Sequence, residues 1–129
     1  MLQTGIKGKQ TIVVTPAQTA AYYGSGALEV FATPAMVALL EETAWRSVQP
    51  YLEEGQATVG TRVDIRHLAA TPLGGKVTCE SELVEIDRRR LVFKVDVFDE
   101  RTKVGEGTHE RFIIQSEKFL AAAKAKKDD

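Results

Sequence analysis

The spacing of hydrophobic residues is helical in one long part of the chain. Residues 33 to 48 read TPAMVALLEETAWRSV, and apolar side chains such as Leu40 and Ala44 recur there on one helical face. Thr33 is suited to the N-cap, and Pro34 is suited to the first helical position. The pattern therefore predicts one long, largely apolar helix over residues 33 to 48, and a helix so apolar belongs in the core.

Elsewhere hydrophobic and polar residues alternate, which is typical of strands. Strands are expected over residues 7–16, 57–68, 76–87, 90–99 and 103–115. The tail from residue 116 predicts only a weak helix that ends in charged residues. One long helix buries its apolar surface in such a protein only if the sheet curls round it. The order of elements therefore predicts an α+β protein with the hotdog fold, a curved antiparallel sheet wrapped around one central helix, as a single domain over residues 1–129.

Composition and charge narrow the classes of protein that remain. The chain has 129 residues, 43% hydrophobic and 27% charged, which is an ordinary balance for one globular domain. The formal net charge of −1 gives no indication of nucleic acid or an anionic membrane as a partner. No apolar run approaches the roughly 20 residues of a membrane span, and the N-terminal residues lack the pattern of a secretory signal. With Cys79 as its one cysteine, the sequence fits a reducing compartment, and a cytoplasmic protein is expected.

Two adjacent glutamates stand in the middle of the apolar helix. Glu42 lies four residues before Arg46, so the two side chains can form an ion pair on the outer face. Glu41 lies between Val37 and Ala44, within the apolar sector. It either reaches an edge and pairs with a basic residue, or it is held in a partly dry site where its charge can act. The helix alone leaves both interpretations open.

The strand over residues 57–68 ends in a histidine on its inward side. Alternation places the following residues on that side: Val59, Thr61, Val63, Ile65 and His67. A lone histidine on an apolar face is usually a core residue, but this face should cover the helix that carries Glu41. The two ionisable groups would then converge in one apolar environment, which is typical of a site. Thr33 lies two helical turns from Glu41, about 12 Å along the axis, and would reach that cleft only from its edge.

Glycines interrupt the last strand, over residues 103–115. Alternation places four residues of this strand on one face: Gly105, Gly107, His109 and Arg111. Two glycines in a strand mark a bulge or a close approach by a ligand or another backbone, and a bulged edge strand is the simplest interpretation. Arg111 is then an anchor for an anion or carbonyl group, or a partner for Glu41. The sequence leaves His109 without a role, and an exposed strand edge favours a dimer.

Three segments carry a resemblance to a known family. EVFATPAMVALLE, VGTRVDIRHLAATPLG and GTHERFIIQSEKF resemble the fluoroacetyl-CoA thioesterase family of hotdog acyl-CoA thioesterases, and the similarity extends over nearly the whole chain with matching spacing. The resemblance implies the catalytic residues Thr33, Glu41 and His67 and the substrate-binding residues Gly60 and Arg111. It also implies an acyl-CoA substrate, no metal and no redox cofactor, since CoA is part of the substrate. A homodimer with clefts at the subunit interface is implied, and a higher oligomer is compatible with it.

One segment departs from the pattern of this family. Members specific for fluoroacetyl-CoA carry phenylalanines just before the helix, as a lid over the acyl pocket. The matching positions here are Gly24 and Ala27, within YYGSGALEVF, and a segment with so little bulk and so much backbone freedom does not build a packed aromatic lid. The sequence therefore predicts a short or small acyl group, with a range broader than fluoroacetyl.

Thioester hydrolysis has a use for each candidate catalytic residue. His67 is the best general base, because the ordinary pKa of histidine is about 6.5. Glu41 orients and charge-stabilises that imidazole, or itself attacks the thioester or activates water. Thr33 forms a hydrogen bond with Glu41 or the substrate, or serves as the nucleophile. Two other classes of protein use similar residues: a hydratase or dehydratase of the same fold, and a non-catalytic acyl-CoA-binding module. Release of free CoA thiol separates hydrolysis from both.

Overall fold

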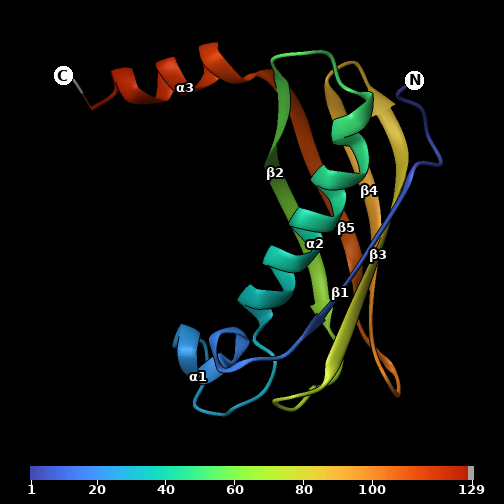
Figure 1. The fold of residues 1–129 in the computed structure, drawn as a ribbon, viewed down its shortest axis with the longest axis vertical. Helices are drawn as coiled ribbons and strands as arrows, with labels where there is room; N and C mark the ends of the chain where they lie inside the picture. The colour runs from blue at the N-terminus through green and yellow to red at the C-terminus, as the bar shows by residue number, and fades with distance from the viewer. Residues whose placement is uncertain (128–129) are drawn as a thin grey trace.

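The computed structural model describes residues 1–127, in which five antiparallel strands wrap around one long helix (Figure 1). The strands are β1 (Lys7–Val13), β2 (Gln56–His67), β3 (Lys76–Asp87), β4 (Arg90–Asp99) and β5 (Lys103–Gln115). The helices are α1 (Ala20–Tyr23), α2 (Thr33–Val48) and α3 (Ser116–Ala125), with short 3₁₀ turns η1 (Pro16–Gln18) and η2 (Gln49–Tyr51). The predicted α+β hotdog fold is confirmed, and β3, β4 and β5 begin and end where the sequence predicts.

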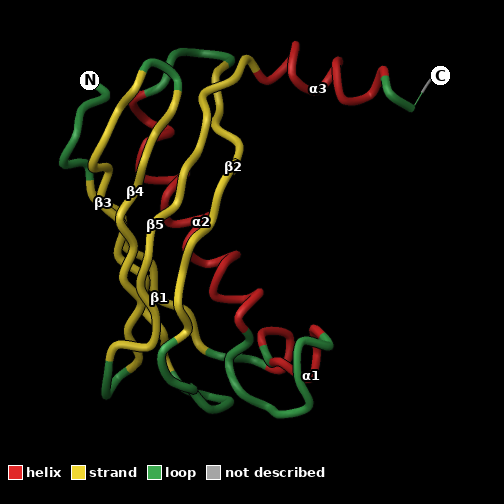
Figure 2. The backbone as a smooth tube through the Cα atoms, turned by 180° about the vertical axis from the view of Figure 1, so that it is seen from behind, coloured by secondary structure: helices red, strands yellow, loops and turns green. Residues whose placement is uncertain are grey.

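The strands are arranged in the order β1-β3-β4-β5-β2, and every neighbouring pair is antiparallel. β1 and β2 are therefore the edge strands, and β5 lies inside the sheet between β4 and β2 (Figure 2). The prediction that residues 103–115 form an edge strand is wrong, but the predicted bulge is present, since the β4–β5 register shifts between Val97 and Phe98, beside Gly105. The glycines of β5 also mark close approaches. A Cβ atom at Gly105 would lie 2.5 Å from Met36 Sδ, and one at Gly107 would collide with the backbone of Asp64.

The helix α2 covers the inner face of the sheet (Figure 1). Its buried side chains lie along one side of the helix. These side chains are Ala35, Met36, Leu39, Leu40, Thr43, Ala44 and Val48. They share one core with fully buried side chains of the strands such as Leu83, Phe93 and Val95. Since each fully buried leucine or phenylalanine contributes about 1.5–3 kcal/mol, this packing holds α2 against the sheet.

A β-bulge in β2 changes which of its side chains face the helix. The pairing register with β5 shifts just after Gly60. Before the bulge, the Thr58 side chain and the side-chain position of Gly60 face α2. After the bulge, the His67 side chain faces α2. The inward position predicted for Val59 is wrong, because Val59 lies opposite the exposed Phe112 on the outer face. One extra residue in a strand reverses its alternation, so simple alternation from His67 backward fails at this point.

The described residues include no helix that is long and apolar enough to cross a membrane. The cysteine at position 79 is a free thiol and is buried in the core. Burial raises the pKa of the Cys79 thiol to about 11, so the thiol stays protonated near neutral pH and fills space as a small apolar group.

Candidate active site

The N-terminus of α2 places a hydroxyl group against the imidazole of His67. α2 begins at Thr33, with Ala32 as the N-cap residue and Pro34 in the first turn. Thr33 is therefore not the N-cap residue that the sequence predicts. Its Oγ1 atom instead lies 2.8 Å from Nδ1 of His67, at the end of β2. This separation is typical of a nucleophile and its general base.

The second ring nitrogen of His67, Nε2, is buried and has no hydrogen-bond partner among residues 1–127. The ring is half-buried and stands edge-on to Phe31, with 6.1 Å between the ring centroids. Burial lowers the pKa of His67 below its ordinary value, against the opposing effect of the Ala69 backbone. His67 is therefore a neutral imidazole near pH 7, which is the form that a general base requires.

A cavity of 340 Å³ lies beside Thr33 and His67. Its other lining residues are small or apolar and include Ala20, Ser25, Val30, Phe31, Ala69 and Ala70. Ser25 belongs to the glycine-rich segment between α1 and α2, so this segment borders the cavity. A site of this size, with a hydroxyl and an imidazole on an apolar wall, has the general character of a small-molecule pocket.

A second group of candidate residues lies further along α2. Glu41 Oε2 is 3.6 Å from Arg111 Nη1, and Gly60 lies opposite Arg111 in the β2–β5 register. A Cβ atom at Gly60 would stand 2.7 Å from Glu41 Oε2, so glycine leaves the room that the carboxylate occupies. The sequence left two roles open for Arg111, an anchor for an anion or carbonyl group and a partner for Glu41. In the structure Arg111 is the partner of Glu41. Glu42 faces outward and pairs with Arg46 at 3.2 Å, as predicted.

The two groups of residues are separate within one chain. Thr33 and Glu41 are eight residues apart on α2, which corresponds to about 12 Å along the helix axis. Gly60 and His67 are seven residues apart on β2, or about 23 Å along the strand. The expected convergence of Glu41 and His67 therefore does not occur within one chain, because the rise along both elements carries the two groups apart.

Thr58 and His109 hold Arg111 in place, and the sequence assigned a role to neither. Arg111 Nε donates to Thr58 Oγ1 at 2.7 Å, and Nη2 donates to the Thr58 carbonyl oxygen at 2.9 Å. His109 Nε2 lies 3.1 Å from Arg111 Nη1. Strand alternation places His109 and Arg111 on one face, two residues apart, and from this spacing the sequence could have predicted their contact. Thr58 has no such signal, because the bulge after Gly60 reverses its expected side.

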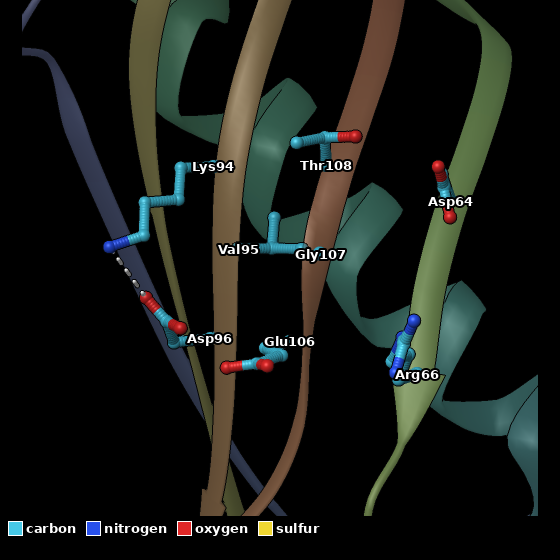
Figure 3. A pocket seen from close by; sticks show the side chains of 8 residues that line it. All are labelled: Asp64, Arg66, Lys94, Val95, Asp96, Glu106, Gly107 and Thr108. Atoms are coloured by element: carbon cyan, nitrogen blue, oxygen red, sulfur yellow. Dashed lines mark ion pairs between the residues drawn. The ribbon is translucent and has the colours of Figure 1, made fainter.

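A hollow of 510 Å³ lies on the other face of the sheet from α2 (Figure 3). Charged side chains line it, and Figure 3 shows Lys94 directed toward Asp96, at 3.8 Å. Lys103 pairs with Asp96 at 2.8 Å and with Glu106 at 2.6 Å. These charges largely neutralise one another, so the hollow is a solvated surface separate from the candidate active site. Within residues 1–127, no cluster of three or more His, Cys, Asp or Glu side chains is placed to hold a metal ion.

Known proteins share both the sequence and the fold of this chain. The family described as fluoroacetyl-CoA-specific thioesterase matches residues 14–117. The fluoroacetyl-CoA thioesterase of Streptantibioticus cattleyicolor is 45% identical over 98 residues, which cover 76% of this chain and 70% of that protein.

Solved structures extend the similarity to almost the whole chain. A variant of the fluoroacetyl-CoA-specific thioesterase, solved in complex with fluoroacetate and CoA, is 39% identical with a TM-score of 0.86, over 92% of this chain and 99% of that one. A hypothetical protein of Thermus thermophilus, described as a thioesterase superfamily member, is 28% identical with a TM-score of 0.91, over 99% of this chain and 95% of that one.

Proposed function

The chain belongs to the fluoroacetyl-CoA-specific thioesterase family, and on that premise we propose that it hydrolyses a short or small acyl-CoA to the free acid and CoA in the cytoplasm. Thr33, Glu41 and His67 form the proposed catalytic set, and Gly60 and Arg111 the substrate-binding residues. The observation that carries the proposal is the 2.8 Å contact of Thr33 Oγ1 with His67 Nδ1 at the wall of a 340 Å³ cavity. The proposed reaction uses no metal or redox cofactor, and CoA enters as part of the substrate.

In the proposed reaction the neutral imidazole of His67 takes a proton from the attacking oxygen. That oxygen belongs to water or to Thr33, whose Oγ1 already lies at hydrogen-bond distance from the ring. It bonds to the thioester carbonyl carbon, the C–S bond breaks, and CoA leaves as a thiol with the transferred proton. If Thr33 attacks, water then hydrolyses the acyl-threonine ester. The first N–H groups of α2 have no intrahelical acceptor and supply hydrogen bonds to the oxyanion.

We propose that the active enzyme is a homodimer paired through β2, because this pairing brings the two groups of residues together. β2 is an edge strand of 12 residues, and its central residues 60–64 are exposed. Such an edge offers unpaired backbone groups to a second strand. Antiparallel pairing about a two-fold axis near residues 63–64 puts His67 of one chain opposite the partner's Gly60. The partner's Glu41, beside that glycine, then faces the Thr33–His67 pair, and each dimer has two such sites.

The position of α3 supports this choice of interface. The helix follows β5 and projects past the β2 edge, away from the sheet (Figure 1; Figure 2). Its Phe119 and Leu120 side chains are 46% and 54% exposed. A second chain paired along β2 would lie on the same side of the molecule as this apolar surface and would cover it.

Mixing two inactive variants is expected to restore activity if each site combines residues of two chains. Homodimers of His67→Ala and of Glu41→Gln are each nearly inactive. After the chains are mixed, unfolded and refolded together, half of the dimers contain one of each, and one of their two sites is intact. Thiol release should therefore reach about a quarter of the wild-type rate per chain.

Two measurements control this mixing experiment. Each variant refolded alone should stay nearly inactive, and light scattering should show a particle of two 14.2 kDa chains at micromolar concentration. Activity that fails to return, although mixed dimers have formed, would place His67 and Glu41 of the same chain in one site. A 14.2 kDa monomer as the only species would contradict the dimer itself.

A panel of acyl-CoA substrates is expected to show hydrolysis of several small acyl groups. The segment with Gly24 and Ala27 borders the cavity through Ser25, and its neighbours Tyr22 and Leu28 are largely exposed. A loose border of this kind gives little discrimination by packing, and one methylene is worth only about 1–3 kcal/mol even in a well-fitted pocket. The ratio of kcat/KM between fluoroacetyl- and acetyl-CoA should then remain far below about 10⁴. Free CoA thiol is measured with acetyl-, fluoroacetyl-, propionyl- and butyryl-CoA.

Variants of the same segment provide the matched comparison. Placing phenylalanine at Ala27 should narrow the range of acyl groups, whereas the exposed Tyr22→Ala change should alter it little. Gly24 is left unchanged, because its φ of 72° disfavours any side chain. A wild-type preference for fluoroacetyl-CoA of about 10⁴-fold or more would show that this segment selects the acyl group as tightly as a packed lid. Binding of the whole panel without thiol release would instead identify a non-catalytic acyl-CoA-binding protein, and hydration of enoyl-CoA a hydratase.

A further inference from the structure

A buried histidine that the proposed reaction does not use lies behind the Glu41 group. His109 of β5 is fully buried, at 0% exposure, between Val63 of β2 and Phe93 of β4 in the strand register. The Phe93 ring stacks on the imidazole, with 6.2 Å between centroids and 30° between planes. An ionisable side chain this deep in the sheet needs defined hydrogen-bond partners.

Both ring nitrogens of His109 have such partners, and together they determine its tautomer. Nδ1 lies 2.8 Å from the Arg62 carbonyl oxygen, which only accepts, so Nδ1 carries the hydrogen. Nε2 lies 3.1 Å from Arg111 Nη1, which only donates, so Nε2 presents its lone pair. Burial lowers the pKa of His109, and the positive charge of Arg111 lowers it further. The hydrogen bond to the Arg62 backbone acts in the opposite direction and raises it. His109 is therefore the neutral imidazole with hydrogen on Nδ1.

The acceptors around Arg111 determine where its guanidinium group points. Thr58 holds Nε through Oγ1 and Nη2 through its carbonyl oxygen, and His109 holds Nη1. With three acceptors on three nitrogens, the planar group has one orientation. In that orientation Nη1 also faces Glu41 Oε2 at 3.6 Å, and it would lie 3.3 Å from a Cβ atom at Gly60.

We propose that His109 is a positioning residue for the reaction: through the lone pair on Nε2 it holds Arg111, and through Arg111 it holds the carboxylate of Glu41 beside Gly60. A carboxylate with a mobile cation would sample several positions, and a misplacement of about 1 Å costs up to about 10²-fold in rate. The inference rests on the proposed role of Glu41 in hydrolysis. It assigns no contact between His109 and the substrate.

Two variants of similar size separate the two hydrogen bonds of His109. In His109→Asn the amide reaches the position of Nδ1 and keeps the bond to the Arg62 carbonyl, but the acceptor for Arg111 is lost. In His109→Gln the longer side chain reaches the position of Nε2 and offers its oxygen to Arg111. We expect His109→Asn to lower kcat by about 10-fold with a smaller change in KM, and His109→Gln to recover most of that loss. Equal losses in both variants would overturn the proposal.

A double-mutant cycle with Glu41→Gln tests the route through Arg111. If His109 acts through the carboxylate, His109→Asn has almost no further effect in the Glu41→Gln enzyme. A full additional 10-fold loss there, as a general loss of packing would cause, overturns the inference. Wild-type turnover of Glu41→Gln alone would instead contradict the proposed catalytic role of Glu41, so the two failures are distinguishable.

The tautomer of His109 is measured independently of activity. Nitrogen-15 NMR of the imidazole groups should show His109 with hydrogen on Nδ1 and a free lone pair on Nε2 at pH 7. Comparison with the spectrum of His67→Ala assigns the signal, because the chain has only 2 histidines. An imidazolium ion, or the tautomer with hydrogen on Nε2, would overturn the proposal. This measurement requires no substrate.

Discussion

Replacing His67 by alanine is expected to lower kcat/KM for short acyl-CoA hydrolysis by about 10²-fold or more, the scale of a lost general base. Thr33 Oγ1 loses the nitrogen 2.8 Å away that would take its proton or that of a bound water. The pH profile checks the assignment. Because only the neutral ring accepts a proton, wild-type kcat/KM should rise with pH along a limb set by the pKa of His67, which burial lowers and the partner's Glu41 in the proposed dimer would raise. The residual activity of His67→Ala should lack that limb.

The control for this variant is its folded state. His67 is half-buried at the end of β2, and its removal costs one side-chain hydrogen bond. We therefore expect His67→Ala to remain a folded dimer, with a circular dichroism spectrum and a light-scattering mass like those of the wild type. Turnover within about threefold of wild type, a loss far below that of a missing general base, would remove His67 from the mechanism.

Replacing Glu41 by glutamine is expected to lower kcat/KM by a similar factor, about 10²-fold or more. The substitution keeps the size of the side chain but removes the negative charge that lies 3.6 Å from Arg111 Nη1 and faces the site of the proposed dimer. The amide has nearly the same shape as the carboxylate and breaks no hydrogen bond of Glu41 within residues 1–127, so the fold should hold. Steady-state thiol release with acetyl-CoA measures the loss.

The adjacent glutamate is a matched control for this charge. Glu42→Gln removes the same charge one residue away, where it forms an exposed ion pair with Arg46. Glu42 also accepts a hydrogen bond from Gln10 Nε2 at 2.6 Å, which the oxygen of a glutamine can accept as well. Exposed pairs contribute about 0–1 kcal/mol, so Glu42→Gln should keep its activity within about threefold and its stability nearly unchanged. Equal effects of the two substitutions would mean that the net charge of α2, and not the position of Glu41, determines the rate.

The elements of this protein were predictable because their signals are local. α2 follows from the spacing of its apolar residues and from Pro34, and β3, β4 and β5 follow from alternation between turn-forming residues. The order of these elements then allows few arrangements, since one apolar helix has to be covered by one curled sheet. The pair of Glu42 and Arg46 is equally local, at a spacing of four residues.

The bulge after Gly60 and the place of β5 in the sheet were not predictable in this way. A bulge has no period of its own, and it appears only when two strands are aligned with each other. Edge position depends on which strands pair, and β5 pairs with both β4 and β2. The glycines at 105 and 107 gave a true signal of close approach, but the sequence does not say whether helix, strand or ligand approaches.

The sequence by itself therefore determined the secondary structure, the hotdog fold and the residue types available for chemistry, all of which depend on neighbours within a few positions. The tertiary structure alone decided which of these residues meet. Thr33 and His67 are 34 positions apart, and Thr58 and Arg111 are 53 apart, so their contacts depend on how α2 lies across the sheet and on the β2–β5 register. The separation of Glu41 from His67 also depends on the tertiary structure, because the distance between a residue of α2 and a residue of β2 is defined only once both elements are placed in space.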